Sequence, residues 1–140
     1  MAMEHDPRYL AGIVLFNRGD FFEAHEVWES LWMDTHGPEK PFVQGLIQAA
    51  VGLCHFCNGN LNGAAKLYRS SRDYMARFGP RYWDVDVDAF WRQMEACFAP
   101  VLAEPPDRSR TIDEALIPEL HPDPAPQHWP DPADFLHEDE

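Results

Sequence analysis

The sequence predicts an all-α protein, a compact bundle of about five helices built from two related helical hairpins and followed by a Pro-rich acidic tail. Helix start and stop signals recur through residues 1–102, where apolar residues return at helical spacing. No stretch shows a convincing strand pattern. The 140 residues, 45% of them hydrophobic, match one domain with a substantial core. We therefore expect a helical bundle domain over 1–102 and a tail over 103–140.

The first two expected helices meet at a single glycine. Asp6 caps the first helix, and the proline after it occupies a position where proline is favoured. Gly19 ends this helix. Asp20 caps the second, with Glu23 three residues later as in a capping box, and this helix runs to about Thr35.

Three more helices complete the expected bundle. The third spans about 39–58, with a glycine directly after it. Asn60 caps the fourth, which ends near Gly79–Pro80. The fifth runs from about Asp86 to Leu102. The connections are short, as in a bundle of antiparallel neighbours.

The composition changes after residue 102. Residues 103–140 carry eight prolines and eleven acidic residues but only two arginines. So many prolines prevent one regular element from forming. We interpret the segment as a solvated acidic tail. Docking of Trp129, Phe135 and Leu136 on the bundle or on a partner is the alternative.

An internal repeat relates residues 16–28 (FNRGDFFEAHEVW) to residues 56–68 (FCNGNLNGAAKLY). In both copies a glycine ends one helix, Asp or Asn caps the next, and an alanine allows close packing, as in tetratricopeptide helix–turn–helix units. Two copies are fewer than the three or so that a solenoid needs. His25 aligns with an alanine and Glu29 with an arginine, so such a hairpin forms without this polar pair.

The stretch FFEAHEVWESLW (21–32) places polar residues among apolar ones. On a helical wheel, His25 and Glu29 fall within an apolar arc that includes Phe22, Trp28 and Met33. We therefore expect both polar side chains to point inward and to touch as an i,i+4 pair.

The third expected helix, apolar nearly all round, is predicted to be central. Gln44, Gln48 and His55 share one side of it, flanked by Gly45 and Gly52. A glycine in mid-helix costs about 1 kcal/mol relative to alanine, which indicates close approach of a backbone or a ligand. The second helix is the expected neighbour.

Together these side chains predict one buried polar cluster: His25, Glu29, Gln44, Gln48 and, as a further candidate, His55. One interpretation is a sealed hydrogen-bond network that includes the indole of Trp28 or Trp32. The other is a functional site. There His25 is the general base, with Glu29 as its orienting partner, and Gln44, Gln48 and Trp32 bind a ligand or cofactor of unknown identity. A metal would be held by His25, Glu29 and His55.

Three segments occur in an order that identifies a family. FNRGDFFEAHEVWESLW, FVQGLIQAAVGLCHF and GNLNGAAKLY resemble the domain-of-unknown-function family 309 (DUF309). Its hallmark, His-x3-Glu-x2-Trp, is matched by His25, Glu29 and Trp32. The resemblance covers about residues 7–80. It implies an all-helical fold, highlights His25 and Glu29, and supplies no reaction. A basic residue often follows the tryptophan in the family, whereas Met33 stands there in this chain.

Composition indicates which partners and which cellular compartment to expect. The net charge of −13 argues against nucleic acid as a partner. No apolar run reaches the ~20 residues that span a bilayer, and the N-terminus lacks a basic region followed by an apolar one. Three cysteines, an odd number without zinc-type spacing, favour a reducing, cytoplasmic compartment.

Two functional hypotheses follow. The first is an uncharacterised small cytoplasmic protein whose semi-buried His/Glu/Gln site binds a small ligand or a metal ion; if it is an enzyme, hydrolysis is the first reaction to test. The second is a tetratricopeptide-like protein-interaction module in which the polar cluster only fixes the packing. An opening through which His25 and Glu29 reach solvent would favour the first.

Overall fold

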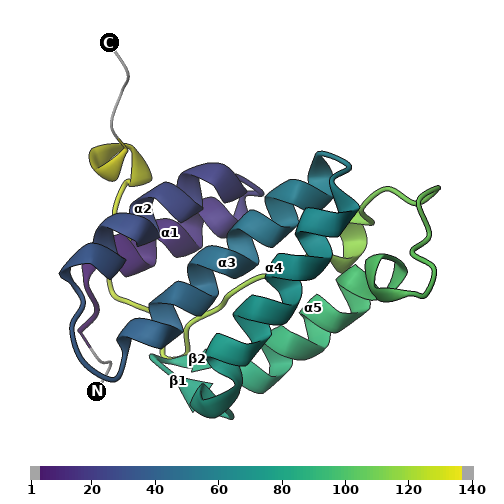
Figure 1. Ribbon diagram of the computed structural model, residues 1–140. Helices are drawn as coiled ribbons and strands as arrows, with labels where there is room; N and C mark the ends of the chain where they lie inside the picture. The colour runs from purple at the N-terminus through teal and green to yellow at the C-terminus, as the bar shows by residue number, and fades with distance from the viewer. Residues whose placement is uncertain (1–3, 137–140) are drawn as a thin grey trace.

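The structure, a computed structural model, describes residues 4–136. Five helices follow one another, each packed on the next, and α3 lies in the middle (Figure 1). Their bounds are Pro7–Asn17 (α1), Phe21–Asp34 (α2), Lys40–Cys57 (α3), Leu61–Met75 (α4) and Val87–Leu102 (α5). The predicted all-α bundle is confirmed. None of the helices within 4–136 has both the length and the hydrophobicity needed to cross a membrane.

The two helical hairpins, α1–α2 and α3–α4, have turns of the same backbone conformation. Gly19 and Gly59 adopt φ of +84° and +78°, a left-handed conformation that glycine accepts without a steric penalty. The next N–H, of Asp20 or Asn60, donates to a carbonyl five residues back over 2.9 Å. The predicted hairpin repeat is therefore present in the backbone itself.

The two caps differ in their side chains. Asn60 Oδ1 accepts from the N–H of Gly63 at 3.0 Å. Asp20 makes no such bond, so the predicted capping box with Glu23 does not form at the Asp20 side chain. Of the two turns, only the one that precedes α4 gains the full stabilisation of an N-cap.

Glycines mark where helices approach closely. The helices that approach, however, are not the second and third, as the sequence predicts. A Cβ on Gly45 would lie 2.2 Å from Met75 Cγ, and one on Gly52 would make ordinary contacts, 3.5 Å or more, with Leu67 and its neighbours. Both neighbours belong to the α4 segment or its C-terminal turn, so α3 faces α4 here and not α2. The tightest glycine is Gly12 of α1, where a Cβ would lie 2.0 Å from Trp28 Nε1.

A short β-hairpin, absent from the sequence prediction, links α4 to α5. After a 3-10 turn at Ala76–Phe78, strands β1 (Arg81–Tyr82) and β2 (Val85–Asp86) pair antiparallel around a two-residue turn. The turn residues, Trp83 and Asp84, have φ of +49° and +64°, as a type I′ turn requires at both positions. Residues other than Gly, Asn and Asp rarely adopt this conformation.

Contacts from distant parts of the chain hold this turn. The Tyr9 hydroxyl donates to the carbonyl of Trp83 at 3.0 Å, and the two rings meet edge to face. His5, almost fully buried, places Nε2 2.9 Å from Asp84 Oδ2. Burial raises the pKa of the Tyr9 hydroxyl well above its usual range, so it stays a donor. The hairpin is thus a product of tertiary packing.

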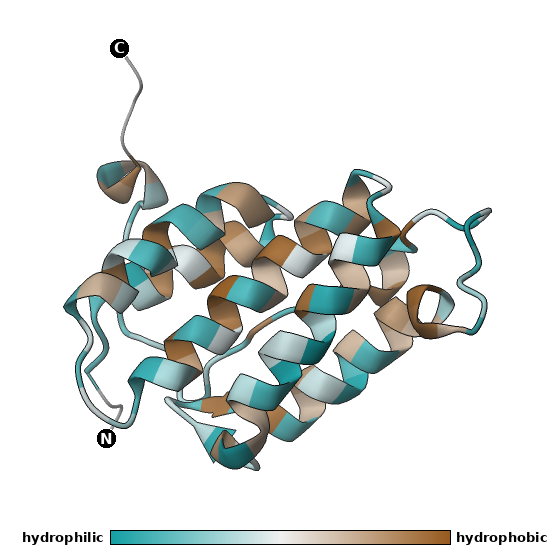
Figure 2. Ribbon diagram, in the orientation of Figure 1, coloured by the Kyte–Doolittle hydropathy of each residue, from teal (hydrophilic) through white to brown (hydrophobic). Residues whose placement is uncertain are grey.

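The segment after α5 is not a solvated tail. It leaves the end of α5, loops outward and returns behind the helices towards α1 and α2 (Figure 1). Leu120 is 1% exposed and belongs to the hydrophobic core, and Phe135 and Leu136 pack on that core while Trp129 stays exposed. Within residues 103–136 the acidic residues are exposed, apart from the half-buried Asp107, and much of this segment is hydrophilic (Figure 2). That residues 1–102 fold without this segment stays a prediction.

Candidate functional site

His25 and Glu29 meet on the outer side of α2. His25 Nε2 lies 3.0 Å from Glu29 Oε2, and His25 Nδ1 lies 3.1 Å from the carbonyl oxygen of Phe22. The Phe22 ring leans on the imidazole, with ring centroids 5.4 Å apart. Each ring nitrogen of His25 thus lies close to an oxygen atom of α2. The predicted contact within the pair is confirmed.

The pair is less buried than the helical wheel predicts. The side chains of His25 and Glu29 keep 21% and 54% of their exposure. Phe22 and Met33, both counted in the apolar arc, are themselves 55% and 65% exposed. Without them the buried side of α2 is narrower and centred away from His25; its residues are Phe21, Ala24, Val27, Trp28 and Leu31. The expectation that both polar side chains point inward is therefore corrected.

The predicted five-residue cluster does not assemble. Within residues 4–136, no hydrogen bond or ion pair joins His25 or Glu29 to Gln44, Gln48 or His55. His55 Nδ1 instead lies 3.3 Å from the side-chain nitrogen of the capping asparagine in the α3–α4 turn. Gln48 Oε1 is buried without a partner. The polar side chains of α3 therefore do not complete a site around the pair.

A metal centre is not formed either. In the described part of the chain, no three His, Cys, Asp or Glu side chains come together as a metal site would require. Of the expected ligands, His25 and Glu29 touch, whereas His55 does not join them. Trp32, expected to contact a ligand or cofactor, has the ammonium group of Lys40 4.1 Å from its ring centroid. This cation–π contact ties α2 to the start of α3.

The geometry of the pair bears on the catalytic role expected for His25. A general base needs a ring nitrogen with a free lone pair within reach of a substrate proton. Here Nδ1 lies 3.1 Å from the Phe22 carbonyl oxygen, and Nε2 lies 3.0 Å from Glu29 Oε2. Each ring nitrogen therefore already has a protein oxygen beside it. The pair instead presents a partly exposed carboxylate beside the Phe22 ring, an arrangement that suits binding of a partner.

An ion-pair network lies along the opposite edge of α2. Arg8 donates to Asp6 Oδ2 at 2.9 Å, to Asp34 Oδ2 at 2.7 Å and to the carbonyl of Ser30 at 3.0 Å. The hydrogen bond from Arg8 holds the pKa of Asp6 below its ordinary value, although burial opposes it. Arg8 thus fastens the start of α1 to the end of α2.

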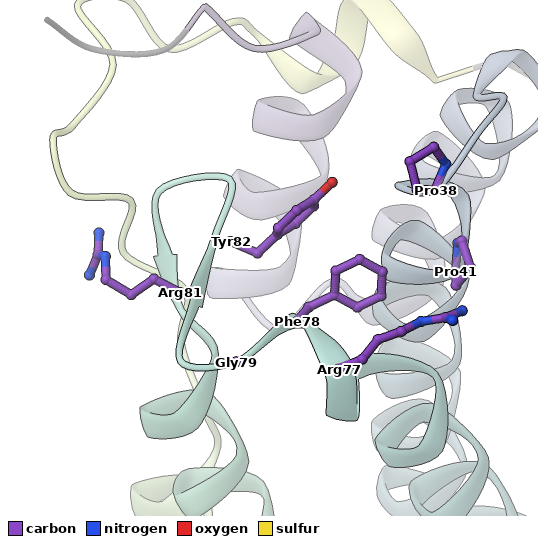
Figure 3. A pocket seen from close by; sticks show the side chains of 7 residues that line it. All are labelled: Pro38, Pro41, Arg77, Phe78, Gly79, Arg81 and Tyr82. Carbon is purple, nitrogen blue, oxygen red and sulfur yellow. The ribbon is translucent and has the colours of Figure 1, made fainter.

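A pocket of about 490 Å³ lies at the C-terminal end of α4, and the sequence analysis did not find it. Its lining residues are Pro38, Pro41, Arg77, Phe78, Gly79, Arg81 and Tyr82. Figure 3 shows the Phe78 ring between Tyr82 and Pro41, with the Arg77 side chain running beneath it towards Pro41. Arg81 points away from the pocket and donates to the carbonyls of Asp84 and Asp123. The segment FGPRYW, with three aromatic residues around one proline, was the sequence feature that could have indicated this pocket.

Comparison with known proteins finds one family model that matches the first part of this chain. Residues 9–67 match the family model described as "Domain of unknown function (DUF309)". The resemblance drawn from the three sequence segments is thereby confirmed, and the match runs from α1 into α4. It contains His25 and Glu29 but excludes the β-hairpin, α5 and the tail.

A relative from Aquifex aeolicus (strain VF5) carries the name "Uncharacterized protein". It is 37% identical to this chain over 57 residues, which cover 40% of this chain and 17% of the relative. This chain therefore matches only a minor part of a much longer protein. Neither comparison brings an activity with it.

Proposed function

We propose that this chain is a helical protein-binding module whose recognition surface is the exposed side of α2. We name this surface the α2 face and define it by Phe22, His25, Glu26, Glu29 and Met33. The observation that carries the proposal is the exposure of Phe22 and Met33, the two most exposed of the large hydrophobic residues described. Eleven residues apart, they project from one side of the helix about 16 Å from each other. Exposed apolar groups on one surface are typical of interaction sites.

The charge of the α2 face defines the partner. Glu26 and Glu29 lie between the two apolar residues and are exposed, and Glu29 is oriented by His25 at 3.0 Å. An acidic strip with an apolar group at each end fits a protein segment that carries two apolar side chains with Lys or Arg between them. In this proposal His25 positions Glu29 and does not act as a base.

The proposal develops the protein-interaction hypothesis and gives the polar pair a place on the surface. Hydrolysis by His25 has less support, because each of its ring nitrogens already has a protein oxygen close to it. A protein partner rather than nucleic acid, and a cytoplasmic setting, are parts of the proposal; they rest on the net charge of −13 and the odd number of cysteines.

Selection from a displayed random-peptide library against the purified full chain tests the α2 face. We expect enriched peptides with a basic residue between apolar ones, and binding at least ten-fold weaker to the double variant Phe22→Ser/Met33→Ser. Glu29→Gln should weaken binding several-fold. Tyr74→Ser, which alters an exposed aromatic on α4, is the matched control and should bind normally. Enriched peptides that bind all four proteins equally would refute the proposal.

A second candidate is binding of a small aromatic carboxylate in the pocket beside Arg77. In the described residues no carboxylate lies within ion-pair distance of Arg77, while Phe78 and Tyr82 offer aromatic surface next to it. Burial, together with the charge of Glu39, raises the pKa of Tyr82, so its hydroxyl stays protonated. A volume of this size suits a small organic ligand.

Tryptophan fluorescence during titration with benzoate tests this candidate, because Trp83 stacks on Tyr82 with ring centroids 5.6 Å apart. We expect a saturable change that Arg77→Gln abolishes and Arg92→Gln, on the exposed side of α5, does not. A linear response, or saturation that Arg77→Gln leaves unchanged, would exclude the pocket as a site for such anions.

A further inference from the structure

Residues 117–123 (IPELHPD) cross the bundle as an extended strip without regular secondary structure. Side chains and the hairpin hold the backbone of this strip. Glu119 N–H donates to Gln93 Oε1 at 3.0 Å, and Asp123 N–H donates to the carbonyl of Asp84 at 2.8 Å. The strip therefore lies between α5 and the β-hairpin, in contact with α1 through its central residue.

Asn17, the last residue of α1, binds that central residue at two points. Its Nδ2 donates to the carbonyl of Leu120 at 2.7 Å, and its Oδ1 accepts from the Leu120 N–H at 2.8 Å. One side-chain amide thus supplies the donor and the acceptor that a neighbouring strand would supply. Recognition of this kind reads an extended backbone and not the identity of the side chain.

The side chains of the strip alternate as in a bound peptide. Pro118, Leu120 and Pro122 are buried, whereas Glu119 and His121 are exposed and paired with each other at 2.8 Å. Extended segments that dock into grooves show this two-residue period, with alternate side chains in pockets. Leu120 is the anchor, because its side chain alone among them joins the hydrophobic core.

The connection between this strip and α5 is long and lightly held. Most of residues 103–116 are exposed, and their one element is a 3-10 turn at Glu114–Leu116. Such a tether keeps the strip near its groove at an effective concentration on the order of millimolar. A ligand in solution competes with the strip only if it exceeds that value or binds more tightly.

We propose that the groove formed by α1, α5 and the β-hairpin is a docking site for a Pro-x-Leu-x-Pro segment of a partner protein, and that residues 117–123 occupy it as a displaceable ligand in cis. The partner segment replaces Leu120 in its pocket and takes the two hydrogen bonds of Asn17. This groove is separate from the α2 face, so each can fail without the other.

A cleavable tether tests the proposal in the full chain. A protease recognition site is inserted between Arg108 and Ser109, both exposed, and the labelled peptide ALIPELHPDPA, identical to residues 115–125, is followed by fluorescence anisotropy. We expect micromolar binding after cleavage and at least ten-fold weaker binding before it. A peptide with Leu120→Asp should not bind. Asn17→Ala should weaken binding to the cleaved protein at least ten-fold, whereas Arg18→Ala, the exposed neighbour, should not.

Three results would overturn the proposal. Cleaved protein that loses its helical circular dichroism would show that the strip is an integral part of the core. Cleaved protein that stays folded but excludes the peptide up to millimolar concentration would show that the strip is not displaceable. Concentration-dependent dimers of uncleaved protein, abolished by Leu120→Asp, would show that the occupant is a second copy and not a partner protein.

Discussion

The hairpins α1–α2 and α3–α4 have turns of the same conformation, but different side-chain interactions stabilise each hairpin. Glycines at equivalent positions take the same left-handed conformation, and equivalent N–H groups bond carbonyls five residues back at the same distance. Around this common backbone the side chains diverge. In the first hairpin the Trp28 ring covers Gly12 and donates to the Tyr9 carbonyl at 3.1 Å. In the second, the equivalent residues Tyr68 and Gly52 make only ordinary contact.

A second pair of equivalent positions shows the same contrast. Arg8 of the first hairpin binds two carboxylates and a carbonyl, whereas Gln48, 40 positions later, has a buried Oε1 without a partner. The common backbone of the two hairpins thus depends on the glycine and on the N–H···O bond that follows it, and the remaining interactions differ. Five predictions separate what the two hairpins share from what each has alone.

The largest expected effect is at Gly12. Gly12→Ala should destabilise the fold by ~2–4 kcal/mol, because a Cβ 2.0 Å from Trp28 Nε1 forces the indole out of place and breaks its bond to Tyr9. Gly52→Ala should instead be neutral or gain up to about 1 kcal/mol from helix propensity. Urea unfolding measures both. Equal losses at the two positions would contradict the contrast between the hairpins.

Removal of Arg8 should have the next largest effect. Arg8→Met should cost ~1–2 kcal/mol at neutral pH, because three interactions are lost at a partly exposed site. Gln48→Met, at the equivalent position, should stabilise by up to about 1 kcal/mol because it removes an unpaired buried oxygen. Thermal unfolding of both variants against the natural chain is the measurement.

The cost of Arg8→Met should also depend on pH. The pKa of Asp6 in the folded state lies below its ordinary value of 3.8, chiefly because of the hydrogen bond from Arg8. The stability that this bond provides is therefore complete above that value and is lost as the pH falls through the lower, folded pKa. The difference between the variant and the natural chain should narrow below about pH 4. A difference that widens there would contradict this assignment.

The caps should differ by a smaller amount. Asn60→Ala should cost about 1 kcal/mol, since its side chain accepts from the Gly63 N–H, and Asp20→Ala only a few tenths, since its side chain makes no cap bond. Chemical denaturation resolves such a difference. If the two substitutions cost the same, the Asp20 carboxylate caps α2 in solution.

The smallest expected effect belongs to the polar pair itself. Glu29→Gln should change stability by about 0–1 kcal/mol, because an exposed ion pair contributes little. The double variant His25→Leu/Glu29→Met should be similarly stable. A loss of several kcal/mol in either would mean that the pair is buried, as the helical wheel predicts.

Local signals explain what could be predicted from the sequence. Asp6, Gly19 and Asn60 act on the turn in which they stand, so the boundaries they indicate agree with the structure to within a few residues. Gly45 was correctly predicted to be a point of close approach. The helix predicted to approach it was wrong: α2 was expected and α4 is found. The sequence does not tell which of the two helices adjacent to α3 faces a given side of it.

The rest depended on contacts between distant segments. The phase of α2 could not be read correctly because Phe22 and Met33 look like core residues, and only the packed structure shows that nothing in residues 4–136 covers them. The β-hairpin lacks the Asn-Gly or Asp-Gly signal, and Trp83 is held in its turn by Tyr9. The pocket is lined by residues near the start of α3 and by residues just after α4, and no local motif predicts that these segments meet.

The bond between Asn17 and Leu120 has a consequence for the kinetics of folding. It joins residues 103 positions apart, whereas the turn of each hairpin is closed by bonds between residues at most five apart. Contacts of such long range form late, because the chain between them must first be ordered. Interactions absent from the transition state affect the rate of unfolding and leave the rate of folding nearly unchanged. This bond therefore contributes to the barrier to unfolding, whereas the glycine turns act on the rate of folding.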